Sequence, residues 1–81
     1  MNVRRVILDL LARRPAGGTL CPSEVARVLA DQSGAPSEWR AQMTPVHQAI
    51  DQMAADGEVG LSWKGRDLAV RSGPYRIRSP R

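Results

Sequence analysis

The 81-residue sequence predicts an α+β fold, a winged helix-turn-helix of three helices and a C-terminal β-hairpin that forms the wing. Before residue 57 the apolar residues recur at helical spacing in three segments, and after it they alternate with polar residues. Neither short helices nor a lone hairpin buries enough apolar surface alone, so the hairpin is expected to cover the helical core. Residues 1–79 are predicted to form one domain, followed by a short tail at residues 80–81.

The first helix is predicted in the N-terminal segment, where the apolar residues fall on one helical face. They are Val3, Val6, Ile7, Leu10 and Leu11. The helix is expected to end near Arg14, because Pro15 and the glycine pair at residues 17–18 cannot continue it. Residues 19–20 then form a short extended link or a single bridge of sheet.

The second helix is predicted to begin at the run Cys-Pro-Ser-Glu, which holds the only cysteine of the sequence. With Pro22 at the first helical position, Cys21 becomes the N-cap and Glu24 the third helical residue, which predicts a capping box with sulfur in place of a hydroxyl. A helix N-terminus also favours a reactive thiolate. The charge of Glu24 opposes this, and no second cysteine is available. Capping or packing is the favoured interpretation, with a thiol sensor and a catalytic nucleophile as alternatives.

The third helix is predicted from Thr44, as a hydroxyl cap, followed by Pro45. The second helix ends around residue 31, and a turn-rich segment leads to a short helix at residues 37–42, capped by Ser37. The third helix has one apolar stripe and ends at Gly57 in the left-handed conformation. The stripe consists of Val46, Ala49, Ile50, Met53 and Ala54.

Two strands are predicted after Gly57, at residues 59–63 and 75–78. Val59, Leu61 and Trp63 alternate with polar or small residues, which is typical of a half-buried strand. Tyr75 and Ile77 alternate with arginines in the returning strand. Residues 64–67 are expected to form the turn, and residues 68–70 extend either the turn or the sheet.

The net charge of +4 is unevenly distributed, because both ends of the chain are basic and the middle is acidic. The basic residues of the predicted hairpin suit phosphate or another polyanion. They are Lys64, Arg66, Arg76 and Arg78. The alternative is an ordinary charged surface, in which Arg76 and Arg78 pair with Glu58 across the hairpin.

The third helix offers polar side chains on its outward face. In a helix-turn-helix protein this helix lies in the major groove, so Thr44, His47 and Gln48 are expected to approach base edges. His47 alternatively lies at the boundary of the core. The helix has no Lys or Arg, and Asp51 and Asp56 would be repelled by phosphates. The leading hypothesis is therefore weak or wing-mediated nucleic-acid binding, possible partners being DNA or another nucleic acid, in a regulatory or accessory factor. The alternative is a protein-interaction module with a protein partner or a second copy of the chain.

Catalysis, cofactors and metal are not expected. One histidine and one cysteine cannot assemble a structural zinc site, and no glycine-rich phosphate loop or serine motif is present. No apolar run is long enough to span a bilayer, so no membrane partner is expected. A single cysteine fits a reducing cytoplasm, which is the expected location.

Several short motifs together resemble a family of short bacterial proteins known only as a domain of unknown function. They are LCPSEVARVLA at residues 20–30, Trp39-Arg40 with Met43, the Gly65-Arg66 turn, and GPYRIR at residues 73–78. The resemblance covers nearly the whole chain and implies a winged-helix-like fold in a bacterial cytoplasmic protein, with no activity attached. The loop at residues 31–37 is longer than is usual in such proteins.

Overall fold

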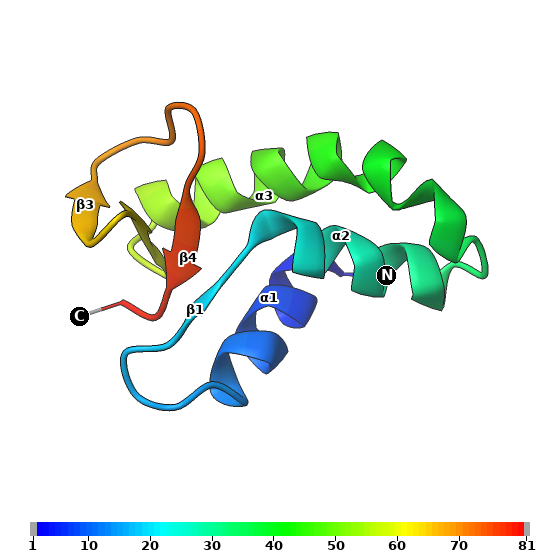
Figure 1. Cartoon of the computed structure of the whole chain (residues 1–81), viewed down its shortest axis with the longest axis horizontal. Helices are drawn as coiled ribbons and strands as arrows, with labels where there is room; N and C mark the ends of the chain where they lie inside the picture. The colour runs from blue at the N-terminus through cyan, green and yellow to red at the C-terminus, as the bar shows by residue number, and fades with distance from the viewer. Residues whose placement is uncertain (1, 81) are drawn as a thin grey trace.

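The computed structural model describes residues 2–80, which form an α+β fold compatible with a winged-helix-like arrangement (Figure 1). The elements in this range are α1 (Val3–Ala12), β1 (Thr19–Leu20), α2 (Pro22–Gln32), the 3-10 helix η1 (Pro36–Gln42), α3 (Met43–Ala55), β2 (Gly60–Trp63), β3 (Arg66–Leu68) and β4 (Arg76–Arg78). The α+β fold class is confirmed. Of the predicted tail, residue 81 lies outside the described residues.

The first helix is confirmed, but it ends two residues before Arg14. The Asn2 side chain caps its start by accepting a hydrogen bond from the Arg5 N–H at 3.2 Å. At the other end the Arg13 N–H bonds to the Leu10 carbonyl at 3.2 Å, so the last turn is already tightened there. The chain leaves the helix through this turn before Pro15 is reached.

The predicted cap of the third helix at Thr44 is wrong. η1 runs directly into α3, whose N-cap is Gln42, and the Met43 N–H bonds to the Arg40 carbonyl. Thr44 therefore lies inside the first turn, and Pro45 stands where a backbone N–H would have no helical partner. Ser37 is likewise not the cap of the short helix, which begins at Pro36.

Trp39 anchors η1 to α2. The guanidinium carbons of Arg27 in α2 and Arg40 in η1 lie 4.3 and 4.4 Å from the centre of the Trp39 ring. Such cation–π contacts are attractive even at exposed sites. The stack holds η1 against α2 and thereby sets the place at which α3 begins.

The sheet has four antiparallel strands in the order β1-β4-β2-β3, rather than the two of the predicted hairpin. The pairing of β2 with β4 matches the predicted hairpin, and β4 also pairs with β1. Residues 66–68 form β3 on the free edge of β2, so residues 66–67 belong to a strand and not to the predicted turn, and of residues 68–70 only Leu68 extends the sheet. The turn is the pair Lys64-Gly65, with φ of 51° and 81°. Positive φ at both positions matches the twist of a tight hairpin, so β3 begins at once.

The core lies between the helices and one face of the sheet. The largest fully buried side chains come from all three α-helices and from β1, β2 and β4: Ile7, Leu20, Val25, Leu29, Val46, Ile50, Leu61 and Ile77. Leu61 pairs with Ile77, and Ile77 with Leu20, so these side chains share the inner face. Alternation along β4 consequently directs Arg76 and Arg78 to the outer face.

Candidate nucleic-acid interface

Thr44 and Gln48 are exposed on α3, one helical turn apart. His47 lies between them in sequence and is half-buried. Residues three and four apart are neighbours on a helix surface. The structure thus brings Thr44 and Gln48 together as an exposed polar pair, with His47 at the edge of the core.

His47 is joined to the residue that precedes β4. Its Nδ1 lies 2.6 Å from the Tyr75 hydroxyl, and the ring centroids are 5.6 Å apart. Partial burial lowers the pKa of His47, the charge of Arg71 adds to this shift, and Asp51 opposes it. Burial raises the pKa of Tyr75. Both groups are therefore held in their neutral forms, and their contact ties α3 to the wing.

Lys64 and Arg66 stand at the tip of the β2–β3 hairpin. Both are exposed, and within residues 2–80 neither forms an ion pair; the Lys64 ammonium lies 6.0 Å from the Trp63 ring centre. Arg66 is the cross-strand partner of Trp63, so the two share a sheet face. Trp63 lines a groove of about 340 Å³ together with His47, which puts Arg66 on the same side of the sheet as α3.

Arg76 is half-buried and bound within the sheet. Its Nε donates to the Thr19 hydroxyl at 2.8 Å, and its Nη2 to the Thr19 carbonyl at 3.4 Å. These bonds join β4 to β1 on the outer face.

Arg78 lies flat over Gly60 on the same outer face. A Cβ at Gly60 would overlap the Arg78 guanidinium, so a larger residue there requires that side chain to move. Arg78 Nη1 donates to the Ser79 carbonyl at 3.1 Å, and its Nε is 3.4 Å from an oxygen of Asp67. Arg76 and Arg78 are thus bonded within the sheet, whereas Lys64 and Arg66 are exposed at the tip. Lys64 nevertheless lines one surface pocket of about 310 Å³ with both strand arginines.

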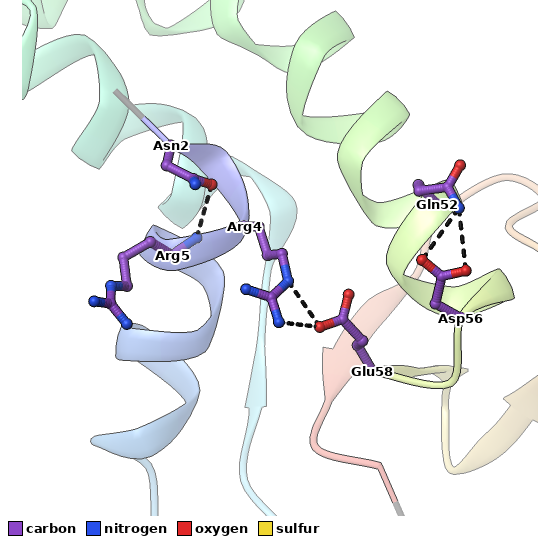
Figure 2. A network of polar contacts seen from close by, with 6 residues as sticks. All are labelled: Asn2, Arg4, Arg5, Gln52, Asp56 and Glu58. Carbon is purple, nitrogen blue, oxygen red and sulfur yellow. Dashed lines mark hydrogen bonds and ion pairs between the residues drawn. The ribbon is translucent and has the colours of Figure 1, made fainter.

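Glu58 binds Arg4 of α1 and neither strand arginine, so the alternative in which Glu58 pairs with Arg76 and Arg78 is wrong (Figure 2). Arg4 Nε donates to Glu58 Oε2 at 2.7 Å, and the Arg4 Nη2 group contacts the same oxygen. This hydrogen bond lowers the pKa of Glu58 and raises that of Arg4. Glu58 precedes β2 and so stands outside the strand ladder, where it meets α1.

Asp51 is paired with Arg71, a contact that sequence reasoning missed. Arg71 Nε donates to Asp51 Oδ1 at 2.7 Å and Nη2 to Oδ2 at 3.1 Å, a two-pronged bond. The hydrogen bond to Asp51 raises the pKa of Arg71. Asp56, the C-cap of α3, accepts hydrogen bonds from Gln52 (Figure 2). No sequence signal joins Asp51 to a loop arginine 20 positions later.

The capping box at the start of α2 is present, as predicted. The Cys21 N–H donates to Glu24 Oε2 at 2.7 Å, and Arg14 donates to Glu24 Oε1 at 2.6 Å. Partial burial alone would raise the pKa of Glu24, but these bonds outweigh it and lower that pKa. The half-buried Cys21 sulfur lies 3.1 Å from the Ser23 hydroxyl. The contacts of this run thus give it a structural role at the helix start.

Neither a metal cluster nor a membrane-spanning helix is found in the described part of the chain. No group of three or more His, Cys, Asp or Glu residues among residues 2–80 is placed to hold a metal ion. No helix in the same range has the length and apolar character needed to cross a membrane.

Comparison with known families agrees with the resemblance found in the sequence motifs. Residues 1–80 match the family described as protein of unknown function DUF3253. No curated protein matches the chain significantly. The match covers far more than half of the 81 residues, so this chain belongs to the DUF3253 family.

Proposed function

We propose that this protein binds nucleic acid through the exposed face of α3 and the tip of the β2–β3 hairpin. The observation that carries the proposal is the position of Lys64 and Arg66, exposed and without ion pairs among residues 2–80. Arg66 shares its sheet face with Trp63, on the side where α3 lies. A duplex lying along α3 can therefore meet the hairpin tip at the same time.

The two parts of this interface have different roles. Lys64 and Arg66 supply charge for phosphates, which gives affinity without sequence preference. Thr44 and Gln48 are side chains that can hydrogen-bond to base edges, and glutamine can bond an adenine through two contacts. His47 adds a ring nitrogen beside them, since its contact with Tyr75 uses Nδ1.

Arg76 and Arg78 are assigned a supporting role in this proposal. Both are bonded within the sheet, to Thr19, Ser79 and Asp67, although Arg76 also lines the groove that holds His47 and Trp63. A phosphate contact by either one would compete with these bonds. With few phosphate contacts, we expect weak binding with a shallow salt dependence, about −0.9 in the log–log slope for each contact.

The test is a fluorescence anisotropy titration of the whole chain against a labelled duplex of random sequence, at about 50 and 200 mM salt. We expect binding at the lower salt concentration that weakens at the higher one. Each phosphate contact contributes about −0.9 to the log–log slope, so Lys64→Ala with Arg66→Ala reduces its magnitude by about 1.8.

The matched control is Arg5→Ala with Arg13→Ala, which removes the same charge from two exposed positions at α1. We expect this variant to keep most of the affinity and the slope. Absence of wild-type binding at low salt, or equal losses in the two double variants, would contradict the proposal.

A second candidate function is docking to a second copy of the chain. The observation that favours it is the exposure of two large apolar side chains at residues 63–70, Trp63 at 37% and Val70 at 73%. Light scattering over a range of concentrations tests it. Self-association that Val70→Asp abolishes would favour this function, and a monomer at all concentrations would contradict it.

A further inference from the structure

α3 carries no cationic side chain, although its exposed face is the helical part of the proposed interface. Asp51 stands one turn after Gln48 on this helix, and an unpaired carboxylate there would repel phosphates. Its pairing with Arg71 changes the charge of the face, because a carboxylate and a guanidinium together are neutral. The cation comes from the segment between β3 and β4, which passes α3 on its way to the last strand (Figure 1).

The geometry of the pair leaves part of the guanidinium available. The bond uses the Arg71 Nε–H and one Nη2–H, and no other described residue binds the Nη1 group. An arginine presents five N–H donors in a planar fork, so Nη1 still offers two of them. The Arg71 side chain is 38% exposed and that of Asp51 is 49% exposed, so an incoming phosphate oxygen can reach the group.

Arg71 lies near the His47–Tyr75 contact and against α3. The charge of Arg71 affects the pKa of both His47 and Tyr75, which places it close to that contact. Asp51, Ala54 and Ala55 of α3 line a pocket together with Ala69, Val70 and Arg71. The segment at residues 69–71 therefore lies against the C-terminal half of the helix.

We propose that Arg71 contacts phosphate and that Asp51 is its positioning residue. Asp51 holds the guanidinium against α3, so that the segment between β3 and β4 supplies the cation this helix lacks. This inference rests on the proposed function. A two-pronged bond fixes the plane of the guanidinium, which reduces the conformational entropy lost when a phosphate binds. Asp51 then favours binding through Arg71, although its own charge is negative.

The experiment is the same anisotropy titration with the random duplex, applied to Arg71→Ala, Arg71→Lys and Asp51→Asn. We expect Arg71→Ala to weaken binding roughly tenfold at low salt, since charged hydrogen bonds are the stronger class, and to reduce the slope by about 0.9. Arg71→Lys keeps the charge but loses the fork, so it should fall between Arg71→Ala and the wild type. Arg5→Ala is the charge-matched control.

Asp51→Asn separates positioning from simple charge. It removes a negative charge, so without positioning it should strengthen binding as much as Asp56→Asn, at the C-cap of the same helix, does. Positioning predicts a loss of about threefold for Asp51→Asn, and no further loss when it is added to Arg71→Ala. Urea midpoints check that each variant is folded.

The outcomes also separate this inference from the proposed function. The inference is overturned if Asp51→Asn strengthens duplex binding as much as Asp56→Asn does. It is also overturned if Arg71→Ala loses no more affinity than Arg5→Ala. In either case Lys64 and Arg66 remain contacts of the proposed function. Absence of wild-type binding overturns both.

Discussion

The Tyr75 hydroxyl lies 2.6 Å from His47 Nδ1 and joins the residue before β4 to the N-terminal half of α3. Tyr75 is buried and His47 half-buried, so each supplies the polar partner that the other lacks. A buried polar group without a partner is costly. The contact therefore helps to set the angle between the wing and the helix, which the proposed interface requires.

This contact makes stability depend on pH through His47. The pKa of His47 is lowered in the folded protein by burial and by Arg71, whereas Asp51 opposes the shift. The unfolded chain therefore binds the proton first as pH falls, and the folded state loses stability below about pH 6.5. Above that pH the stabilising contribution is fully present. Urea midpoints between about pH 7 and 5 measure the loss.

The control for the pH effect is His47→Gln, which has no titrating group. In this variant the urea midpoint should no longer fall between about pH 7 and 5. The lowered pKa values of Glu24 and Glu58 affect stability only at more acidic pH. Tyr75→Phe should be destabilised by about 1 kcal/mol above pH 7, since it leaves Nδ1 without this partner. An unchanged slope in His47→Gln would refute the assignment.

Lys64→Asn should stabilise the fold while it weakens binding to the random duplex. Lys64 has a φ of 51°, a conformation that asparagine tolerates better than lysine and that favours Asn-Gly in tight hairpins. We expect a gain of about 0.5 kcal/mol in urea unfolding, together with a loss of affinity.

Lys64→Ala is the matched variant, because it removes the same charge without the turn preference. It should lose affinity as Lys64→Asn does, but without gaining stability. Equal stability of the two variants would show that the positive φ of Lys64 does not reduce the free energy of unfolding.

Gly60→Ala should destabilise the protein by about 1 kcal/mol. The new methyl group would stand where the Arg78 guanidinium lies, so that side chain must leave its position over β2 and its contact with Asp67. In an Arg78→Ala background the same change should be neutral or stabilising, because alanine restricts the unfolded chain more than glycine does. Additive effects in this double-mutant cycle would argue against the steric explanation.

Glu24→Ala should cost about 1 kcal/mol, the usual effect of losing a helix cap. The carboxylate accepts from the Cys21 N–H and from Arg14, and both bonds disappear with it. Asp31→Ala, which removes an exposed acid from the other end of α2, should be neutral or slightly stabilising. Thermal unfolding compares the two, and an equal loss in both would assign the effect to charge rather than to the cap.

Much of the fold follows from local patterns in the sequence. The three helical stripes predicted α1, α2 and α3 because helical spacing places those residues on one face. The capping box of Cys21 and Glu24 was predicted because its bonds join residues three apart. Gly57 ends α3 with a φ of 74°, as expected for a left-handed terminus.

The elements that were wrong or missed depend on neighbours more distant in the chain. β3 has three residues and no clear alternation, and it becomes a strand because the edge of β2 is available to it. Thr44 has the chemistry of a cap, but η1 already supplies the turn that precedes it. Local propensity was overridden in both cases by the packing of adjacent elements.

The sequence by itself determined the α+β class, the places of the helices and the charges that the wing carries. Only the tertiary structure decided which charges bind one another: Glu58 meets Arg4 across 54 positions, and Asp51 meets Arg71 across 20. Hydrophobic periodicity is a local property, whereas ion pairs between distant residues form only after the core has brought their elements together. For this reason only the fold decided that Arg76 and Arg78 are bonded within the sheet while Lys64 and Arg66 stay exposed at the hairpin tip.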